Sequence, residues 1–188
     1  MTIADKLKWD AKYTSMHPSR PSPPPSLAAN IQHLKTGRLL DVACGEGAAA
    51  LALSKDPQFQ VTAVDVSEIG LKNLQIFASE QGCKLTTCHQ DLDDLSALQD
   101  LGEFDSITVF RYKPSIELIF TLTAMLSPRG RLIISTFNGR HHLETGFAAK
   151  FCLTEGEFLK LALPATLICY SSSQQLPFTD SYVFERNR

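Results

Sequence analysis

Short apolar segments alternate with longer amphipathic segments from residue 38 onward. The apolar segments have the length and the β-branched and aromatic content that predict β-strands. The predicted strands cover residues 38–42, 59–64, 84–88, 104–110 and 131–137. Helical segments are predicted around and between them, at residues 27–34, 46–55, 68–81, 94–100 and 115–127. Apolar strands that alternate with helices predict an α/β domain with a mostly parallel sheet and helices on both faces.

The C-terminal part of the chain departs from this alternation. Thr154 and Glu157 have capping-box spacing, which predicts a helix from there to about residue 163. Two further strands are expected at residues 165–171 and 178–185, and the short polar segment "SSSQQLP" between them favours antiparallel pairing. No repeat or second boundary interrupts the sequence, so residues 27–188 are expected to form a single domain.

Residues 1–26 are expected to form an N-terminal appendage. Residues 3–13 predict a helix in which Trp9 and Tyr13, four positions apart, share a face. The proline-rich stretch "HPSRPSPPPS" at residues 17–26 excludes helix and central strand. We interpret it as an extended connector across the domain, with a ligand for an SH3-type groove as the alternative. Trp9 and Tyr13 either close a lid over the domain or pack into its core.

Composition and charge are those of an ordinary globular chain. The 188 residues are 44% hydrophobic and 20% charged, and the net charge of −2 argues against a broad nucleic-acid or anionic-membrane surface. The charged start "MTIADKLKWDAKY" lacks the apolar core of a signal peptide, and no apolar segment approaches the ~20 residues that cross a bilayer. The five cysteines include no CxxC pair, so reduced thiols in a cytoplasmic protein are expected. Cys44 is interpreted as a small buried residue rather than as a nucleophile.

Acidic residues follow or end three successive predicted strands. Asp41 ends the first strand, Asp65 follows the second, and Asp91 comes shortly after the third. The carboxyl ends of parallel strands meet at one edge of the sheet, where ligands of such folds bind. Burying carboxylates there costs several kcal/mol unless they are hydrogen-bonded or paired. The pattern therefore predicts a ligand that is rich in donors or positively charged.

The bend "CGEG" beside Asp41 narrows the choice of ligand. Gly45, Gly47 and Ala50 fit the loose GxGxxG/A pattern of dinucleotide-binding proteins, and a nicotinamide-dependent oxidoreductase is one interpretation. A pyrophosphate on that loop would, however, lie close to the negative charge of Asp41. S-adenosylmethionine carries an ammonium, a sulfonium and a ribose diol but no phosphate. Asp41 is then expected to serve the methionine end, Asp65 the ribose hydroxyls and Asp91 the adenine amine.

Five segments carry a resemblance to a known family. "LLDVACGEG", "VTAVDVS", "HQDL", "FDSITVFRY" and "LSPRGRLIISTFN", over about residues 38–137, resemble in order and spacing the motifs of class I S-adenosylmethionine-dependent methyltransferases. "DVACGEG", together with "WDAKY" and the proline-rich stretch, is similar to the small-molecule branch that includes tellurite-resistance methyltransferases. Ala48 and Ala49 depart from that branch, where arginine and asparagine are often found.

The resemblance implies a single-domain Rossmann-like methyltransferase fold with S-adenosyl-L-methionine as cofactor. It also implies a set of cofactor-binding positions. These are Asp41, Ala43, Gly45, Gly47, Asp65, Val66, Asp91, Leu92 and Phe110. The implied reaction is direct displacement of the methyl group onto an acceptor, helped mainly by alignment and exclusion of water.

The acceptor side is expected after the fourth and fifth strands. Arg111 and Tyr112 are candidates for binding an anionic or polar acceptor, and His141, in the predicted loop "FNGRHHLETG", for binding or deprotonating it. The absence of an NPPY or DPPY tetrapeptide argues against methylation of DNA adenine. No His/Cys grouping predicts a metal site. We expect a small-molecule acceptor, including soft nucleophiles and chalcogen oxyanions, with a protein or RNA methyltransferase or a non-catalytic cofactor-binding module as alternatives.

Overall fold

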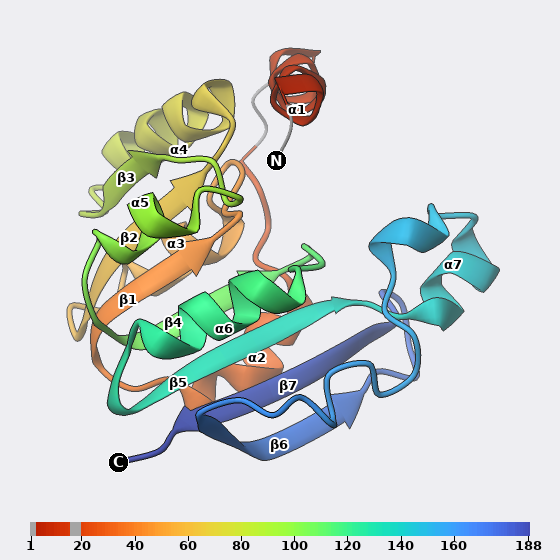
Figure 1. The fold of residues 1–188 in the computed structure, drawn as a ribbon. Coiled ribbons are helices and arrows are strands. Elements are labelled where there is room, and N and C mark those ends of the chain that lie inside the picture. Colours follow the sequence, from red (N-terminus) through yellow and green to blue (C-terminus); the bar gives the residue numbers. More distant parts are fainter. Residues whose placement is uncertain (1–2, 16–19) are drawn as a thin grey trace.

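The structure is a computed structural model that describes residues 3–15 and 20–188. A seven-stranded sheet forms its centre, in the order β3-β2-β1-β4-β5-β7-β6 (Figure 1). The strands are β1 (Gly37–Val42), β2 (Phe59–Asp65), β3 (Thr86–His89), β4 (Phe104–Phe110), β5 (Leu126–Phe137), β6 (Ala165–Ser172) and β7 (Thr179–Arg186). β7 runs antiparallel to β5 and β6, and the other neighbouring strands pair in parallel. The predicted mostly parallel sheet with an antiparallel C-terminal pair is confirmed.

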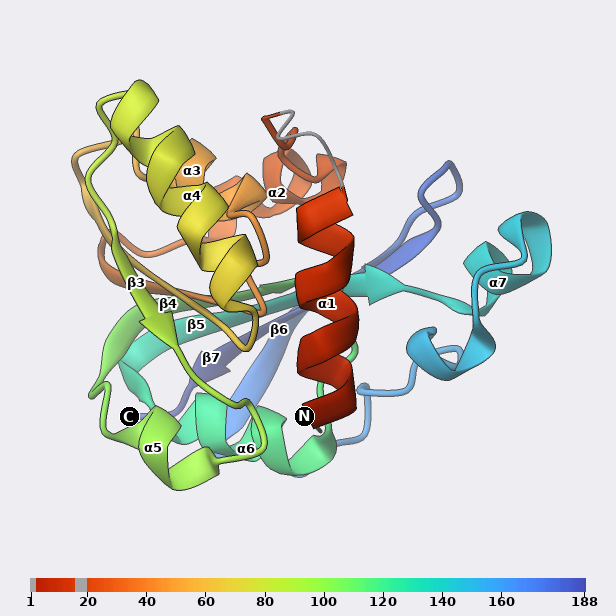
Figure 2. The same ribbon diagram turned by 90° about the horizontal axis from the view of Figure 1, so that it is seen from above.

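Helices cover both faces of the sheet, as predicted. The α-helices are α1 (Ile3–Ser15), α2 (Pro25–Asn30), α3 (Ala48–Leu53), α4 (Glu68–Glu80), α5 (Leu95–Gln99), α6 (Ile116–Ala124) and α7 (Gly139–Thr145). Two short 3-10 helices, η1 (Ile31–His33) and η2 (Ala149–Phe151), complete the set. Figure 2 shows α2, α3 and α4 on one face and α5 and α6 on the other. Within the described residues, no helix has the length and apolar character that crossing a membrane requires.

The core consists of two apolar clusters, one on each face of the sheet. Leu118 and Leu122 of α6 pack in one of them, and Leu71 and Leu74 of α4 in the other. Both clusters take apolar side chains from the central strands, which explains why those strands are apolar without alternation. Such a core holds the carboxyl ends of β1, β2 and β4 in fixed positions. The rigid edge that results is where the predicted ligand-binding residues lie.

Two predictions for residues 138–163 are wrong. No helix follows Thr154, because residues 155–160 form turns and Gly156 adopts a left-handed φ of +65°. The Glu157 carboxylate does accept a hydrogen bond from the Thr154 backbone N–H, at 2.7 Å, but it also pairs with Lys113 at 2.9 Å. The predicted loop after β5 instead contains the helix α7, whose N-terminus is capped by the Asn138 side chain.

The N-terminal segment lies at the carboxyl edge of the sheet. α1 sits beyond the strand ends beside α4 in both ribbon views (Figures 1 and 2). Of the proline-rich stretch, residues 17–19 lie outside the described residues, while residues 20–24 have no regular structure and α2 begins at Pro25, two residues earlier than predicted. The position of α1 places its side chains over the predicted site. Its action as a lid stays a prediction.

Candidate functional site

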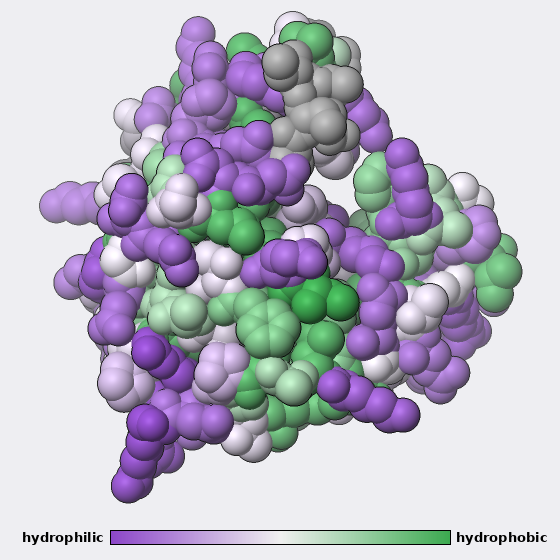
Figure 3. All heavy atoms as spheres, viewed as in Figure 1, coloured by the Kyte–Doolittle hydropathy of each residue, from purple (hydrophilic) through white to green (hydrophobic). Residues whose placement is uncertain are grey.

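A cavity of about 640 Å³ opens at the carboxyl edge of the sheet. The ends of β1, β2, β4 and β5 form its floor, while α1 and the segment around α7 form opposite walls. In the space-filling view the surface is hollowed between the α7 region and the rest of the molecule (Figure 3). Of the predicted site residues, Asp41, Ala43, Gly45, Asp65, Val66, Phe110, Arg111, Tyr112 and His141 line the cavity. The structure therefore brings most of the predicted residues together.

Asp41 occupies the floor of the cavity and is only 2% exposed. The Thr108 hydroxyl donates to one carboxylate oxygen at 2.8 Å, and the Ala50 backbone N–H donates to the other at 3.1 Å. Burial raises the pKa of Asp41 to about 7, against the effect of these two hydrogen bonds. No ion pair reaches this carboxylate from the described lysine, arginine or histidine residues. Its two oxygens keep unused lone pairs, because each receives a single donor from the residues that the structure describes.

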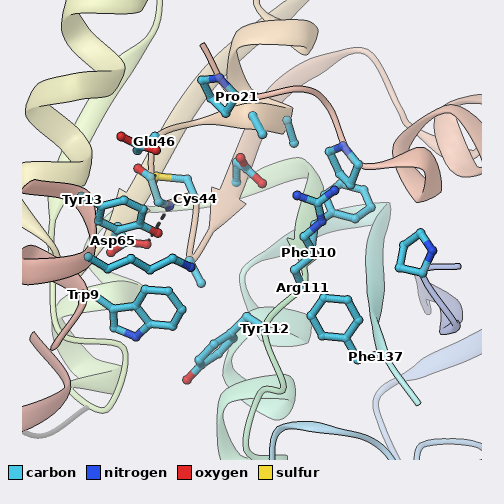
Figure 4. Close-up of a pocket in the computed structure, with 18 of the residues that line it drawn as sticks. Trp9, Tyr13, Pro21, Cys44, Glu46, Asp65, Phe110, Arg111, Tyr112 and Phe137 are labelled. Atoms are coloured by element: carbon cyan, nitrogen blue, oxygen red, sulfur yellow. Dashed lines mark hydrogen bonds between the residues drawn. The ribbon is translucent and has the colours of Figure 1, made fainter. Parts of the chain in front are cut away.

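Asp65 lies beside Asp41 and has a similar environment. Its two oxygens accept backbone N–H bonds from Gly45 and Ser67, both at 2.8 Å. Burial raises the pKa of Asp65, which shows that these bonds do not fully replace water around the charge. Asp65 thus fastens the glycine bend to the end of β2 and still faces the cavity (Figure 4).

The glycine bend requires unusual backbone angles. Gly45 and Gly47 have φ values of +55° and +78°, and Ala43 adopts +56° although it carries a Cβ. A Cβ at Gly45 would strike the Tyr13 hydroxyl, and one at Gly47 would strike the Leu74 side chain. The bend therefore needs glycine for its conformation and for close approach. Strained non-glycine residues such as Ala43 concentrate at functional sites.

Three predicted cofactor residues do not line the cavity. Gly47 turns the chain into α3 and faces Leu74. Asp91 accepts a hydrogen bond from the Asp93 backbone N–H at 2.9 Å, which is a local turn contact. Leu92 is fully buried in the core cluster on the α5 and α6 face. The predicted adenine-binding role of Asp91 and Leu92 stays a prediction.

Helix α1 forms the wall of the cavity on the side of β1 and β2. Trp9, Lys12 and Tyr13 line it, and the Trp9 and Tyr13 rings lie 5.9 Å apart, on the shared face that their spacing predicts. Burial and the nearby Asp65 raise the pKa of Tyr13. In Figure 4, Tyr13 lies close to Asp65 and Cys44. The sequence did not single out Lys12, because a lysine on a charged helix carries no distinguishing signal.

A polar cluster fastens α1 to the start of α4. Asp10 accepts hydrogen bonds from the Ser67 hydroxyl at 2.5 Å and from the Ile69 backbone N–H at 3.4 Å. Lys6 pairs with Asp10 at 2.9 Å and with Glu68 at 3.6 Å. Burial alone would raise the pKa of Asp10, but the hydrogen bonds from Ser67 and Lys6 lower it overall. The Asp10 carboxylate lies at the N-terminus of α4, where the helix dipole favours a negative charge.

The opposite wall of the cavity is aromatic. The Phe137 ring, at the end of β5, stacks on His141 at 4.3 Å and meets Phe147 at 4.9 Å. Burial lowers the pKa of His141, and its Nδ1 is buried without a hydrogen-bond partner among the described residues. Phe137 ends β5, so the expectation that ligands bind at the carboxyl ends of parallel strands could have identified it. Phe147 follows α7, a helix that the sequence did not predict, so no sequence pattern pointed to it.

Two further residues, Glu46 and Cys44, line the cavity on the side of the glycine bend. Glu46, within the glycine bend, accepts a hydrogen bond from Asn73 at 2.8 Å and also lines the cavity. Cys44 is a cavity residue whose pKa is raised by burial, so its thiol is not activated as a nucleophile. In the described part of the chain, no group of three or more His, Cys, Asp or Glu side chains is arranged to hold a metal ion.

Comparison with known proteins agrees with this geometry. Residues 39–130 match the family described as methyltransferase domain. The ubiquinone biosynthesis O-methyltransferase of Xanthomonas campestris is 28% identical over 162 residues, which cover 83% of this chain and 64% of that relative. The chain thus spans somewhat less than two thirds of the length of that curated relative.

Solved structures show the same fold at lower identity. TehB from Haemophilus influenzae superimposes with a TM-score of 0.71 at 13% identity, over 95% of this chain and 67% of that one. A second solved structure comes from work on echinomycin biosynthesis, on the conversion of a disulfide bond into a thioacetal group. It superimposes with a TM-score of 0.77 at 18% identity, over 97% of this chain and 93% of that one. At these identities the likeness concerns the fold alone.

Residues 39–130 are thus a methyltransferase domain, and the chain has the fold of the class I S-adenosylmethionine-dependent methyltransferases. S-adenosylmethionine is the methyl donor that this family implies. The residues present fit it: two buried carboxylates, Asp41 and Asp65, which have no cationic partner among the described residues, lie beside a bend that excludes Cβ atoms. S-adenosylmethionine carries an ammonium, a sulfonium and ribose hydroxyls, which are the groups that such carboxylates can bind.

Proposed function

We propose that this protein transfers the methyl group of S-adenosylmethionine to a hydroxyl group of a small molecule. The observation that carries the proposal is the pair of buried carboxylates, Asp41 and Asp65, facing a cavity that continues to an aromatic wall. The donor supplies a methyl group activated by its sulfonium. The acidic side of the cavity suits the donor, and the side formed by β5 and α7 remains for the acceptor.

The residues of this chain have distinct proposed roles toward the donor. Asp41 attracts its ammonium directly or through water, and Asp65 accepts hydrogen bonds from its ribose hydroxyls. Ala43, Gly45 and Gly47 shape the bend that lets the backbone come close, and Val66 and Phe110 contribute apolar surface. Trp9 and Tyr13 cover the site from α1 and keep water from the reacting atoms.

His141 is the proposed proton acceptor. Its lowered pKa keeps the imidazole neutral at pH 7, and its Nδ1 has no hydrogen-bond partner among residues 3–15 and 20–188. A hydroxyl acceptor must lose a proton when the new bond forms, and a neutral imidazole can take it. The name of the Xanthomonas relative, an O-methyltransferase, supports this choice of acceptor atom. A thiolate or a chalcogen anion would need no such base.

Donor binding is the first test. We expect S-adenosylhomocysteine to bind with micromolar affinity in calorimetric titration, and Asp65→Ala to weaken binding by about 1–3 kcal/mol, since charge-assisted hydrogen bonds are lost. Asp105→Ala is a control, because Asp105 bonds to the Arg38 backbone at the opposite end of β4. A folded wild-type protein that does not bind S-adenosylhomocysteine would rule the proposal out.

Activity separates the acceptor classes. A screen with a labelled methyl donor should compare hydroxylated small molecules with thiols, selenium and tellurium oxyanions, proteins and RNA. We expect transfer to hydroxyl groups, and we expect His141→Ala to reduce it most near pH 7, where the imidazole is neutral while the hydroxyl is largely un-ionised. At low pH the imidazole is already protonated, so the effect of the substitution should be smaller there. Transfer to thiols or oxyanions that survives His141→Ala would replace the hydroxyl proposal with the soft-nucleophile alternative.

A further inference from the structure

The charged residues of the cavity are divided between its two sides. Asp41, Asp65 and Glu46 line the side formed by β1 and β2. Two cationic side chains, Lys12 and Arg111, also line the cavity, and Arg111 follows the end of β4, toward β5 and the aromatic wall. Figure 4 shows Arg111 beside Phe110 and Phe137, across the cavity from Tyr13, Asp65 and Glu46. The positive charge of Arg111 therefore belongs to the acceptor half.

Arg111 reaches the cavity through a strained backbone. Its φ of +57° lies in the left-handed region that an arginine rarely adopts, and its backbone N–H is held by the Ser135 carbonyl at 2.9 Å. Such a conformation persists only where the surrounding structure enforces it, and it is frequent at functional sites.

The guanidinium of Arg111 makes no ion pair or hydrogen bond with the residues that the structure describes. Arg111 is an exposed residue whose side chain opens to the cavity, and partial desolvation there lowers its pKa. Desolvation lowers the pKa of Lys12, the Glu46 carboxylate opposes this, and the positive charges of Lys8 and then Arg111 lower the pKa further. An anion bound beside Arg111 would relieve part of this repulsion.

The cavity that Arg111 lines also has flat, apolar side chains. Tyr112, Phe137, Phe147 and Pro177 are among its lining residues. Aromatic walls favour planar, unsaturated ligands through stacking and edge-to-face contacts. A planar guanidinium next to such walls suits a carboxylate on the same planar molecule, because it can donate two parallel hydrogen bonds.

We propose that the acceptor is a hydroxylated aromatic molecule with a carboxylate, and that Arg111 selects it by binding that carboxylate. The inference rests on the proposed function, because it names the acceptor of that same site. Tyr112, Phe137 and Phe147 hold the ring, and His141 receives the proton of the hydroxyl. Arg111 is thereby a specificity-determining residue rather than a proton acceptor.

The competing role for Arg111 is to bind the carboxylate of the donor. Lys12 is the better placed residue for that group, because it comes from α1 above the glycine bend and interacts with Glu46 within it. The two roles give different results for a variant at Arg111. Loss of donor binding indicates the competing role, and loss of acceptor selection alone indicates the proposed one.

Matched ligands and matched variants test the inference by calorimetric titration. The ligands are hydroxybenzoates and the corresponding hydroxybenzamides, which share ring and hydroxyl groups but differ in charge, added to the protein saturated with S-adenosylhomocysteine. The variant is Arg111→Asn, because asparagine tolerates a left-handed backbone. The control is Arg129→Asn, because Arg129 also has a left-handed φ, +61°, but contacts Glu185 outside the cavity.

We expect wild type and Arg129→Asn to bind a hydroxybenzoate at least about tenfold more tightly than its amide. Arg111→Asn should abolish that preference and leave S-adenosylhomocysteine affinity within about twofold of wild type, and Arg111→Lys should retain part of the preference. An equal preference in Arg111→Asn, or no binding of any ring compound at millimolar concentration, would overturn the inference and leave donor binding intact. A parallel loss of S-adenosylhomocysteine affinity in Arg111→Asn would assign Arg111 to the donor, and failure of wild type to bind S-adenosylhomocysteine would remove the proposed function itself.

Discussion

At the scale of single residues, the two buried carboxylates show how the protein prepares for a cationic ligand. Asp41 and Asp65 are held by backbone and hydroxyl donors, yet burial still raises the pKa of both. Their charge is only partly stabilised by the protein itself. A ligand that brings donors or positive charge removes this unfavourable desolvation, so part of its affinity arises from relief of a cost already present in the fold.

The raised pKa of Asp41 predicts a pH dependence of donor binding. Asp41 titrates near pH 7 in the folded protein, against an ordinary value of 3.8, so it is largely protonated at pH 6. The donor's ammonium favours the ionised form. We expect S-adenosylhomocysteine affinity to rise with pH, by up to about tenfold per unit below pH 7, and to level off above it. Calorimetric titration between pH 5.5 and 8.5 measures this dependence.

The variant Asp41→Asn isolates the contribution of this carboxylate. Its S-adenosylhomocysteine affinity should be lower at pH 8 and should depend less on pH, with the remaining slope due to Asp65, whose pKa is also raised. The free energy of unfolding of the wild type should fall as pH rises, whereas its affinity for S-adenosylhomocysteine should increase. A raised folded-state pKa stabilises the wild type fully below about pH 4, and this contribution is lost as pH rises to about 7. An identical pH profile for wild type and variant would refute the role of Asp41.

At the scale of elements, α1 is attached to the domain by few contacts. Its polar cluster of Lys6, Asp10, Ser67 and Glu68 lies at the start of α4, and Tyr13 rests over Gly45 and Gly70. An element held mainly by polar surface contacts opens at a lower free energy than the core. Such a helix can admit the donor and then cover it.

The variant Asp10→Asn should release α1. It weakens the bonds to the Ser67 hydroxyl and the Ile69 N–H, so we expect faster amide hydrogen exchange in residues 6–14 and a change in the emission of Trp9, the single tryptophan. S-adenosylhomocysteine affinity should fall severalfold, with little change in global unfolding. Asp100→Asn, at the exposed end of α5, is the control. Unaltered exchange in α1 together with unaltered affinity would show that α1 does not act as a lid.

The elements that sequence reasoning predicted well are those with a strong local pattern. β1, β2 and β4 are apolar and buried on both faces, so their apolar segments alone identify them. The helix after Thr154 was predicted from a capping box that does form in part, but Gly156 in a left-handed conformation and the ion pair of Glu157 with Lys113 favour a turn. The ion pair joins residues far apart in sequence, so no local pattern reveals it.

The residues of the candidate site also fall into those that a local sequence pattern indicates and those that it does not. Asp41, Gly45 and Asp65 were found because strand ends and glycine spacing determine their place. Lys12 and Phe147 reach the cavity only through the packing of α1 and of the segment after α7, which the sequence pattern does not determine. Asp91 shows the converse, because its strand-end position is as expected but its carboxylate makes a local turn contact away from the cavity.

At the scale of the whole molecule, the ligand site occupies one edge of the sheet and leaves the outer strands uninvolved. The cavity takes residues from α1, β1, β2, β4, β5 and the α7 region, whereas β6 lines no part of it. Binding to the folded state alone stabilises it by RT ln(1 + [L]/Kd), about 2.7 kcal/mol at 100 times Kd. All amides that exchange through global unfolding therefore gain the same protection, whereas amides that exchange through local opening gain protection only near the ligand.

Hydrogen exchange with and without S-adenosylhomocysteine should reveal this division. At 100 times Kd we expect added protection at residues 43–47 and in α1, because the ligand contacts the glycine bend and holds its roof closed. Amides of β6 that exchange by local fraying should be unchanged, since β6 is an edge strand paired only with β7 and lines no part of the cavity. Slowing spread evenly over β6 and the glycine bend, or confined to β6, would place the ligand elsewhere. The same measurement on Asp65→Ala should lose the protection at the bend first, because that carboxylate ties the Gly45 backbone to β2 in the free protein.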